Sequence, residues 1–273
     1  MDKGLKIAII GGSGVYGNPY LEDPRELVVE TGYGRALLSH GYYKTREIYF
    51  LARHGTGHAI PPHRVNYRAN IAALKKLQVD AVISTAATGS MRREMAPGSK
   101  VVIDQFIDFT KNRLQTFYEG GREGVVHVDM TEPYCPEIRR AILQAGKELG
   151  VPLFDGGCYV CTEGPRFETP AEIRIFAQWG ADLVGMTNVP EVILAREAGL
   201  CYATIALVSN YAAGIAAAPL NQDEVIEAVE RGKEALDRLL LEAAVAVKAE
   251  RDCHCSQSGG PWPPEGEVGG RGS

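Results

Sequence analysis

The sequence predicts an α/β fold with a mixed, largely parallel sheet flanked by helices. Short apolar, β-branched segments alternate with helical patterns along the chain, which is the element order of such folds. Many of these segments are apolar on both faces, as buried central strands are. The chain has 273 residues, 45% of them hydrophobic, and neither a repeat nor a linker interrupts residues 1–250. We therefore expect a single domain over residues 1–252.

The individual elements follow from local pattern. Strands are expected where β-branched and apolar residues run together, at residues 6–10, 48–52, 81–85, 101–106, 158–160, 183–186 and 202–208. Helices are expected where apolar residues recur at helical spacing, at residues 70–77, 135–149, 171–179 and 191–198. In the last helix, Asn221 can cap the first turn with Glu224 as its capping-box partner, and the periodic pattern continues to about Arg251.

Composition narrows the class of partner. The net charge of −5, with both signs interspersed, argues against nucleic acid, because backbone binding requires a basic surface. The sequence has no run of about 18 apolar residues, so no membrane span is expected. The apolar run Ile7–Ile10 is too short for a signal peptide, which predicts a cytoplasmic protein.

Six cysteines in 273 residues are too few for a disulfide scaffold. Cys158 and Cys161 have the CxxC spacing, but strand alternation would place their side chains on opposite faces, so we interpret them as core residues. A second CxxC that could complete a zinc site with them is lacking. Residues 253–273 begin with a Cys-His-Cys sequence, and the Gly/Pro-rich residues 256–273 that follow it are expected to form a disordered tail.

The glycine-rich stretch after the first strand indicates an anion site. Gly12, Gly14 and Gly17 fit the GxGxxG pattern of dinucleotide-binding folds, but Pro19 and Pro24 follow where that pattern needs a helix. The backbone N–H groups of such a turn, together with the Ser13 hydroxyl, can still hold an anion.

Polar or small residues also end four other predicted strands. Arg53 and His54 follow one of them, and an arginine can present two N–H groups to a phosphate. Residues 84–90, 185–191 and 209–211 end the others. Because ligands of open α/β sheets bind beyond the carboxyl ends of the strands, these groups are expected to share one site.

A carboxylate is held on a turn within residues 162–172. Gly164-Pro165 stops a strand, and Thr169-Pro170 with the acidic Glu172 opens a helix. Glu168 lies between them beside Phe167, where α/β enzymes place ligand-reading groups.

These motifs together resemble the methylthioadenosine phosphorylase family over about residues 5–250. The resemblance is carried by residues 11–14, 52–55, 65–70, 103–108, 163–168 and 185–191. It implies the nucleoside phosphorylase fold in a homotrimer or a dimer of trimers. It also implies phosphorolysis, in which nucleoside and phosphate give free base and sugar 1-phosphate, with phosphate as co-substrate and no metal or organic cofactor.

The resemblance also implies a set of site residues. Phosphate contacts would come from Ser13, Arg53, His54, Ala86, Ala87 and Thr187. Met186 would lie under the ribose, and His127 would reach the 5′ end of the sugar from a neighbouring subunit, unless it is an ordinary surface histidine. Some thermophilic members form a disulfide at a Cys-x-Cys near the C-terminus; Cys253 and Cys255 could do so here or remain two exposed thiols.

The base-binding residues depart from the family's usual 6-aminopurine pattern. Asn210 and Ala212, on either side of Tyr211, stand where enzymes for 6-aminopurines carry Asp. Asn210 can offer N–H to both N7 and O6 of a 6-oxopurine, and Glu168 can accept from its N1–H, as the 6-oxopurine enzymes of the family do. With adenine, Glu168 would face a lone pair, at a cost of about 1–3 kcal/mol.

At the 5′ end, Gln222 replaces the apolar residue of methylthioadenosine enzymes and favours a 5′-hydroxyl, unless it is only a solvated residue of the helix. The expected function is therefore a purine nucleoside phosphorylase for inosine and guanosine in purine salvage. The alternatives are a methylthioinosine phosphorylase, a methylthioadenosine phosphorylase and a non-catalytic nucleoside sensor.

Overall fold

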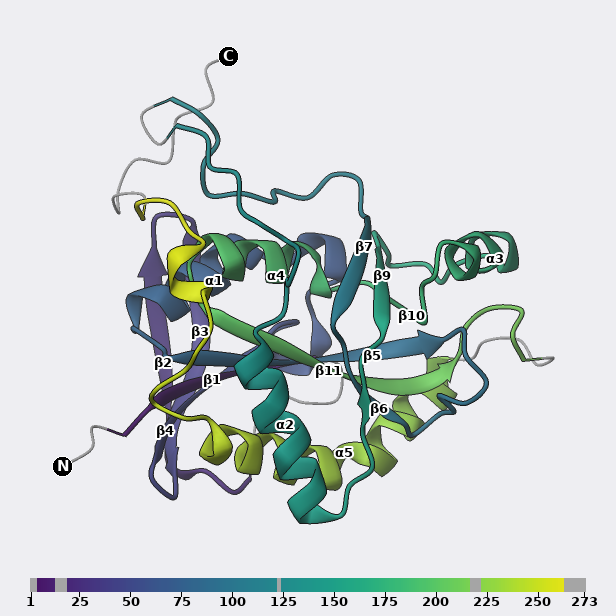
Figure 1. The fold of residues 1–273 in the computed structure, drawn as a ribbon, viewed down its shortest axis with the longest axis horizontal. Helices are drawn as coiled ribbons and strands as arrows, with labels where there is room; N and C mark the ends of the chain where they lie inside the picture. Colours follow the sequence, from purple (N-terminus) through teal and green to yellow (C-terminus); the bar gives the residue numbers. More distant parts are fainter. Residues whose placement is uncertain (1–3, 13–18, 122–123, 217–221, 263–273) are drawn as a thin grey trace.

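The computed structural model describes residues 4–12, 19–121, 124–216 and 222–262 and has the predicted α/β architecture (Figure 1). Eleven strands of this described part form one sheet. The strand order is β2-β3-β4-β1-β5-β10-β9-β7, while β11 pairs with β5 and β6, and β8 pairs with β6. The strands are Lys6–Gly11 (β1), Glu22–Thr31 (β2), Gly34–Tyr43 (β3), Arg46–Ala52 (β4), Ala81–Ser90 (β5), Lys100–Val102 (β6), Gln105–Phe109 (β7), Phe154–Asp155 (β8), Cys158–Thr162 (β9), Leu183–Gly185 (β10) and Cys201–Tyr211 (β11).

Helices cover both faces of the sheet (Figure 1). They are Tyr67–Lys76 (α1), Pro136–Leu149 (α2), Pro170–Gln178 (α3), Asn188–Glu197 (α4) and Gln222–Ala246 (α5), with short 3₁₀ turns at Thr56–His58, Pro62–Arg64 and Cys255–Gln257. In β1, Ala8 and Ile10 pack with α1 and α4, whereas Ile7 and Ile9 pack with α2 and α5. Because successive side chains of a strand point to opposite faces, one continuous apolar run contributes to the apolar cores on both sides of the sheet.

Local signals explain where the helices begin and end. The Asn66 side chain accepts a hydrogen bond from the Ala69 N–H and caps α1. The Thr169–Glu172 capping box opens α3. Gly150 ends α2 in the left-handed region, where glycine adopts φ 67° without the steric cost of a side chain. None of the described helices is both long enough and apolar enough to cross a membrane.

The structure differs from the predicted elements mainly in four places. The antiparallel pair β2–β3 was not expected, because its residues are largely exposed and β2 contains Pro24. The strand predicted at residues 101–106 is two strands, β6 and β7, parted at Asp104, whose side chain accepts from the Gly157 N–H. Strand β5 continues to Ser90, five residues beyond its predicted end, and α5 ends at Ala246 rather than near Arg251. Asn221, the expected cap of α5, lies outside the described residues.

The beginning of the expected C-terminal tail is packed against the domain. Cys255 is 2% exposed, and the Trp262 ring lies 4.9 Å from that of Phe117. Apolar burial of these side chains fixes residues 253–262 on the fold. Residues 263–273 lie outside the described part of the chain.

Candidate active site

An interruption in the sheet marks the candidate site. Strand β1 pairs with β5 as far as Ser84, and β10 pairs with the same edge of β5 only at Gly89 and Ser90. Between these pairings, residues 85–88 have no strand neighbour on that edge within the described chain. Ala86 and Ala87, two of the predicted phosphate contacts, therefore lie where backbone groups of a central strand are left for a ligand.

Arg53, at the end of β4, enters this region fully buried. Its Nε and Nη2 donate to the two carboxylate oxygens of Glu191, both at 2.7 Å. Nη2 also donates to Ser84 Oγ at 2.6 Å, and Nη1 donates to the Thr85 carbonyl at 2.9 Å. The bidentate pairing thus goes to Glu191 in α4, and among the described residues one N–H of Nη1 remains for an anion.

At Gly12, the loop after β1 approaches β5 so closely that the position needs a glycine. Its N–H donates to Thr85 Oγ1 at 2.8 Å, which ties the loop to β5. A Cβ atom on Gly12 would lie 2.8 Å from the Thr85 carbonyl oxygen and 3.1 Å from Arg53 Nη1. Arg53 Nη1, which carries the remaining N–H, therefore lies close to the backbone of this loop. Ser13, the next predicted phosphate ligand, lies outside the described residues.

His54 is a neutral imidazole rather than a cation. Burial, aided by the positive charge of Arg53, lowers its pKa from 6.5 to about 3. Its Nδ1 lies 2.8 Å from the Ile60 carbonyl oxygen, which can only accept, so Nδ1 carries the proton. Nε2 then presents a lone pair, and His54 can accept a hydrogen bond from a protonated phosphate oxygen.

The base-binding candidates lie along a row of paired residues that crosses the sheet from β9 through β10 and β5 to β11. Gly185 of β10 pairs with Cys161 of β9, Val184 pairs with Gly89 of β5, and Gly89 pairs with Asn210 of β11. The strand pairing therefore brings together the ends of segments that are far apart in sequence. Met186 follows Gly185 in the middle of this row and lies close to Gly164, where a Cβ would be 2.6 Å from its sulfur.

Glu168 is 8% exposed at one end of the row. Thr162 Oγ1 donates to its Oε1 at 2.6 Å. Burial raises the pKa of the Glu168 carboxyl, and the Thr162 hydrogen bond opposes this shift. In the described part of the chain, no side-chain donor reaches the other carboxylate oxygen. The Glu168 backbone N–H also bonds to the carboxylate, and because each carboxylate oxygen has two lone pairs, the carboxylate can still accept from a ligand N–H.

Asn210 is oriented by its two chain neighbours. Its Oδ1 accepts from Ser209 Oγ at 2.7 Å, and its Nδ2 donates to the Tyr211 carbonyl at 2.8 Å. The Tyr211 carbonyl, which can only accept, fixes which end of the amide is the NH₂ group. One N–H of Nδ2 remains among the described contacts, so donation to both N7 and O6, as expected from sequence, would require the bond to Tyr211 to be released.

Of the other predicted site residues, the structure describes the contacts of three. Thr187 is buried and immediately precedes α4, and its N–H donates to the Tyr159 hydroxyl at 3.2 Å. The Ala212 N–H donates to the Ser90 carbonyl at 2.8 Å, and the Tyr211 hydroxyl donates to the Arg93 carbonyl at 3.0 Å. The Gln222 side chain lies outside the part that the structure describes.

His127 is exposed in the stretch between β7 and α2. The neighbouring Val126 packs near Gly260, where a Cβ would lie 2.6 Å from a Val126 methyl group. This stretch therefore packs with the C-terminal segment of its own chain. Contacts within one chain do not bring His127 to Glu168 or Asn210 in the described residues.

Two structural residues of the site were not identified from sequence. Glu191 neutralises Arg53 across 138 positions of the chain. Arg113 donates to the carbonyl oxygens of Val189 at 2.5 Å, Thr162 at 3.1 Å and Glu163 at 2.8 Å. Arg113 thereby ties the start of α4 to the end of β9, beside Glu168. Its segment has no periodic pattern that would have indicated this role.

Comparison with known proteins identifies the family. The model of the phosphorylase superfamily matches residues 6–246. A probable 6-oxopurine nucleoside phosphorylase of Moorella thermoacetica is 53% identical over 256 residues, covering 94% of this chain and 98% of the relative. The 6-oxopurine nucleoside phosphorylase of Pyrococcus furiosus is 52% identical over 258 residues, covering 93% and 97%. An adenosine/methylthioadenosine phosphorylase mutant of Schistosoma mansoni in complex with methylthioadenosine has a TM-score of 0.87 at 35% identity, covering 93% and 95% of the two chains.

The chain belongs to the phosphorylase superfamily. Its architecture is the nucleoside phosphorylase fold, as expected from the sequence motifs. It is an enzyme of the nucleoside phosphorylase type, a pentosyltransferase acting on small-molecule nucleosides.

Proposed function

We propose that this enzyme cleaves 6-oxopurine nucleosides, inosine and guanosine, with phosphate to give the free base and ribose 1-phosphate. The observation that carries the proposal is the pair formed by Glu168 and Asn210 at the strand ends. One presents a buried carboxylate oxygen and the other a fixed amide N–H. The relatives from Moorella thermoacetica and Pyrococcus furiosus have 6-oxopurine names and are more than half identical to this chain.

The proposed phosphate site uses the opening in the sheet. The free N–H of Arg53 and the backbone of Ala86 and Ala87 would donate to phosphate oxygens, with Thr187 at the start of α4. The neutral His54 would accept from a protonated phosphate oxygen at Nε2. Ser13 is proposed as a further donor from the family pattern.

The proposed chemistry separates charge at the glycosidic bond. The ribosyl carbon becomes positive and the departing purine becomes negative. Phosphate on one side stabilises and then captures the ribosyl cation. On the other side, the N–H of Asn210 would strengthen its hydrogen bond as negative charge grows on the base, which stabilises the transition state more than the bound substrate.

Glu168 would select the base. A 6-oxopurine carries an N1–H that the free carboxylate oxygen can accept, and guanine adds a 2-amino donor. Adenine has a lone pair at N1, so the buried carboxylate would face an acceptor without a donor between them. The carboxylate therefore favours inosine and guanosine over adenosine.

The main alternative is a methylthionucleoside substrate, because the similar Schistosoma mansoni structure contains methylthioadenosine. Methylthioinosine would satisfy Glu168 and Asn210 equally well, so the alternatives differ in the 5′ pocket, where Gln222 is proposed to favour a hydroxyl. We also propose that His127 completes this pocket from a neighbouring subunit of a trimer.

The proposal is tested by measuring free base released from inosine, guanosine, adenosine, methylthioinosine and methylthioadenosine in phosphate. We expect inosine and guanosine to have the largest kcat/KM. Equal rates with adenosine would contradict the roles of Glu168 and Asn210. Faster cleavage of methylthioinosine than of inosine would contradict only the role of Gln222. Release of base from none of the five would indicate a nucleoside sensor.

A further inference from the structure

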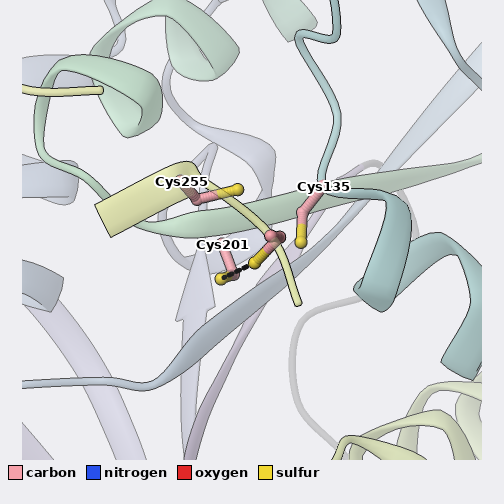
Figure 2. Close-up of side chains that lie close together, drawn as sticks. Cys135, Cys201 and Cys255 are labelled. Carbon is pink, nitrogen blue, oxygen red and sulfur yellow. Dashed lines mark hydrogen bonds between the residues drawn. The ribbon is translucent and has the colours of Figure 1, made fainter. Parts of the chain in front are cut away.

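Four cysteine side chains converge at the amino-terminal end of β11, the end opposite to Asn210. Figure 2 shows three of them, Cys135, Cys201 and Cys255, with their side chains close together. Together with Cys253 they form a group, here called the cysteine cluster, in which all four sulfur atoms lie within 4.8 Å of one another. The Sγ atoms of Cys201 and Cys253 are 3.6 Å apart, and all four residues are free thiols.

We propose that the cysteine cluster binds one tetrahedral metal ion, Zn²⁺, through its four sulfur atoms. A zinc ion bound to four thiolates at about 2.3 Å has sulfur–sulfur edges of about 3.8 Å. The Cys201–Cys253 edge, 3.6 Å, is already close to this length, and because no edge exceeds 4.8 Å, the others need to contract by at most about 1 Å. Side-chain rotation can supply such a movement because the sulfurs come from three separate segments of the chain.

The ligands are held by regular structure rather than by a single loop. Cys135 precedes α2, and its N–H donates to the Tyr202 carbonyl at 2.8 Å. Cys201 is the first residue of β11, and Cys255 begins a 3₁₀ turn after α5. Cys135, Cys201 and Cys255 are at most 6% exposed, while Cys253 is half-buried. A closed, mostly buried set of four sulfurs is typical of structural rather than catalytic zinc.

The charge around the cluster suits metal-bound thiolates. Four thiols lose four protons when Zn²⁺ binds, which leaves a site of net charge −2. Arg196 is 8% exposed, and its Nη1 donates to Cys255 Sγ at 3.4 Å. Arg251 lines the cavity that adjoins Cys201 and Cys253. These two cations would offset the negative charge, and the hydrogen bond to sulfur is the kind of outer contact that orients a metal ligand.

A route for the ion is present. A cavity of about 480 Å³ opens beside Cys201 and Cys253, between the end of α1 and the segment after α5. This cavity lies at the opposite end of β11 from Asn210, so it does not belong to the nucleoside site. Metal binding here would fasten the C-terminal segment to α2 and β11.

The first test is the metal content of the full chain purified with reductant and without chelator. We expect about one zinc ion per chain in the wild type by inductively coupled plasma mass spectrometry. We expect Cys253→Ser to lose most of this zinc. Cys158→Ser is the matched control, because Cys158 lies in β9 outside the cluster and its loss should leave the zinc content unchanged.

A second test does not depend on the variants folding. Zinc is removed from the wild type and replaced with Co²⁺, which should produce the sulfur-to-cobalt charge-transfer and tetrahedral ligand-field bands of thiolate coordination. Proton release on adding Zn²⁺ should accompany binding. The proposal is overturned if the wild type carries no zinc and Co²⁺ gives no thiolate bands. Disulfides between cluster cysteines, found by mass spectrometry of zinc-free protein purified without reductant or oxidant, would also overturn it.

Discussion

The two ends of β11 are built from different chemistry. At the carboxyl end, Ser209 and Asn210 belong to a network of oxygen and nitrogen donors and acceptors. At the amino end, Cys201 belongs to the cysteine cluster. The nine residue steps between Cys201 and Asn210 correspond to about 30 Å of strand. One strand thus joins the nucleoside site to a region that holds the C-terminal segment.

The difference shows how each end is stabilised. In the candidate site, buried charges are already paired inside the protein, as in Arg53 and Glu191, and only single donors or acceptors remain for ligands. The amino end contains four cysteine sulfurs, which a metal ion would hold together by coordination. Substitutions at one end should therefore change activity, and substitutions at the other end should change stability alone.

The largest expected effect is that of Arg53→Met. It leaves Glu191 as an unpaired buried carboxylate, which should lower the free energy of unfolding by about 3–5 kcal/mol and abolish phosphorolysis. Denaturant unfolding and base release measure the two effects. The matched double variant Arg53→Met/Glu191→Met should regain much of the stability and none of the activity. Recovered activity in the double variant would show that Arg53 is not needed for phosphate.

Asn210→Asp should have the next largest effect. Loss of the amide N–H at the base should reduce kcat/KM for inosine by about 10²–10³-fold and raise the rate on adenosine relative to inosine. The melting temperature should change little. Asn66→Asp is a suitable control, because aspartate also caps a helix and α1 lies outside the site. An unchanged ratio of inosine to adenosine rates would contradict the assignment.

His54 should make the fold sensitive to acid. Its pKa is about 3 in the folded protein and 6.5 when free, so between these values the unfolded chain binds a proton that the folded protein does not. Stability should therefore fall as the pH falls from 6.5 toward 3, by up to a few kcal/mol. Unfolding of the wild type and His54→Gln between pH 7 and pH 4 measures this, with a shallower dependence expected for the variant. Parallel curves would indicate that His54 titrates normally.

The smallest effect is expected at the amino end. Cys253→Ser should lower the free energy of unfolding by about 0.5–3 kcal/mol, as for other substitutions of partly buried side chains. The kcat/KM for inosine at 25 °C should stay at the wild-type value. A chelator should lower the melting temperature of the wild type toward that of the variant. A change in substrate preference would show that the two ends of β11 are coupled.

Much of the fold could be predicted from sequence because its central strands are continuous apolar runs. Strands β1, β5, β10 and β11 were located in this way, and α2 and α3 by periodicity and capping signals. The pair β2–β3 could not be found, because both strands are mostly exposed and lack the apolar signal.

Site residues could be predicted from sequence only where they belong to a short local motif. Glu168 and Asn210 stand in recognisable local contexts at strand ends. The pairing of Arg53 with Glu191 and the convergence of Cys135 with Cys255 depend on residues more than 100 positions apart. Such contacts are set by the topology of the sheet, and local sequence does not encode them. The neutral state of His54 likewise follows from burial, which residue identity alone does not reveal.

The pairing of Arg53 with Glu191 also bears on how fast phosphate arrives. The arginine charge is cancelled within the protein, His54 is neutral, and the chain as a whole carries a net charge of −5. A phosphate ion approaching from solution would therefore meet little long-range attraction from this site. Capture would depend on short-range donors at the end of the diffusional path, so the association rate should vary little with ionic strength. An enzyme with an open cationic funnel would slow sharply in salt, and this one should not.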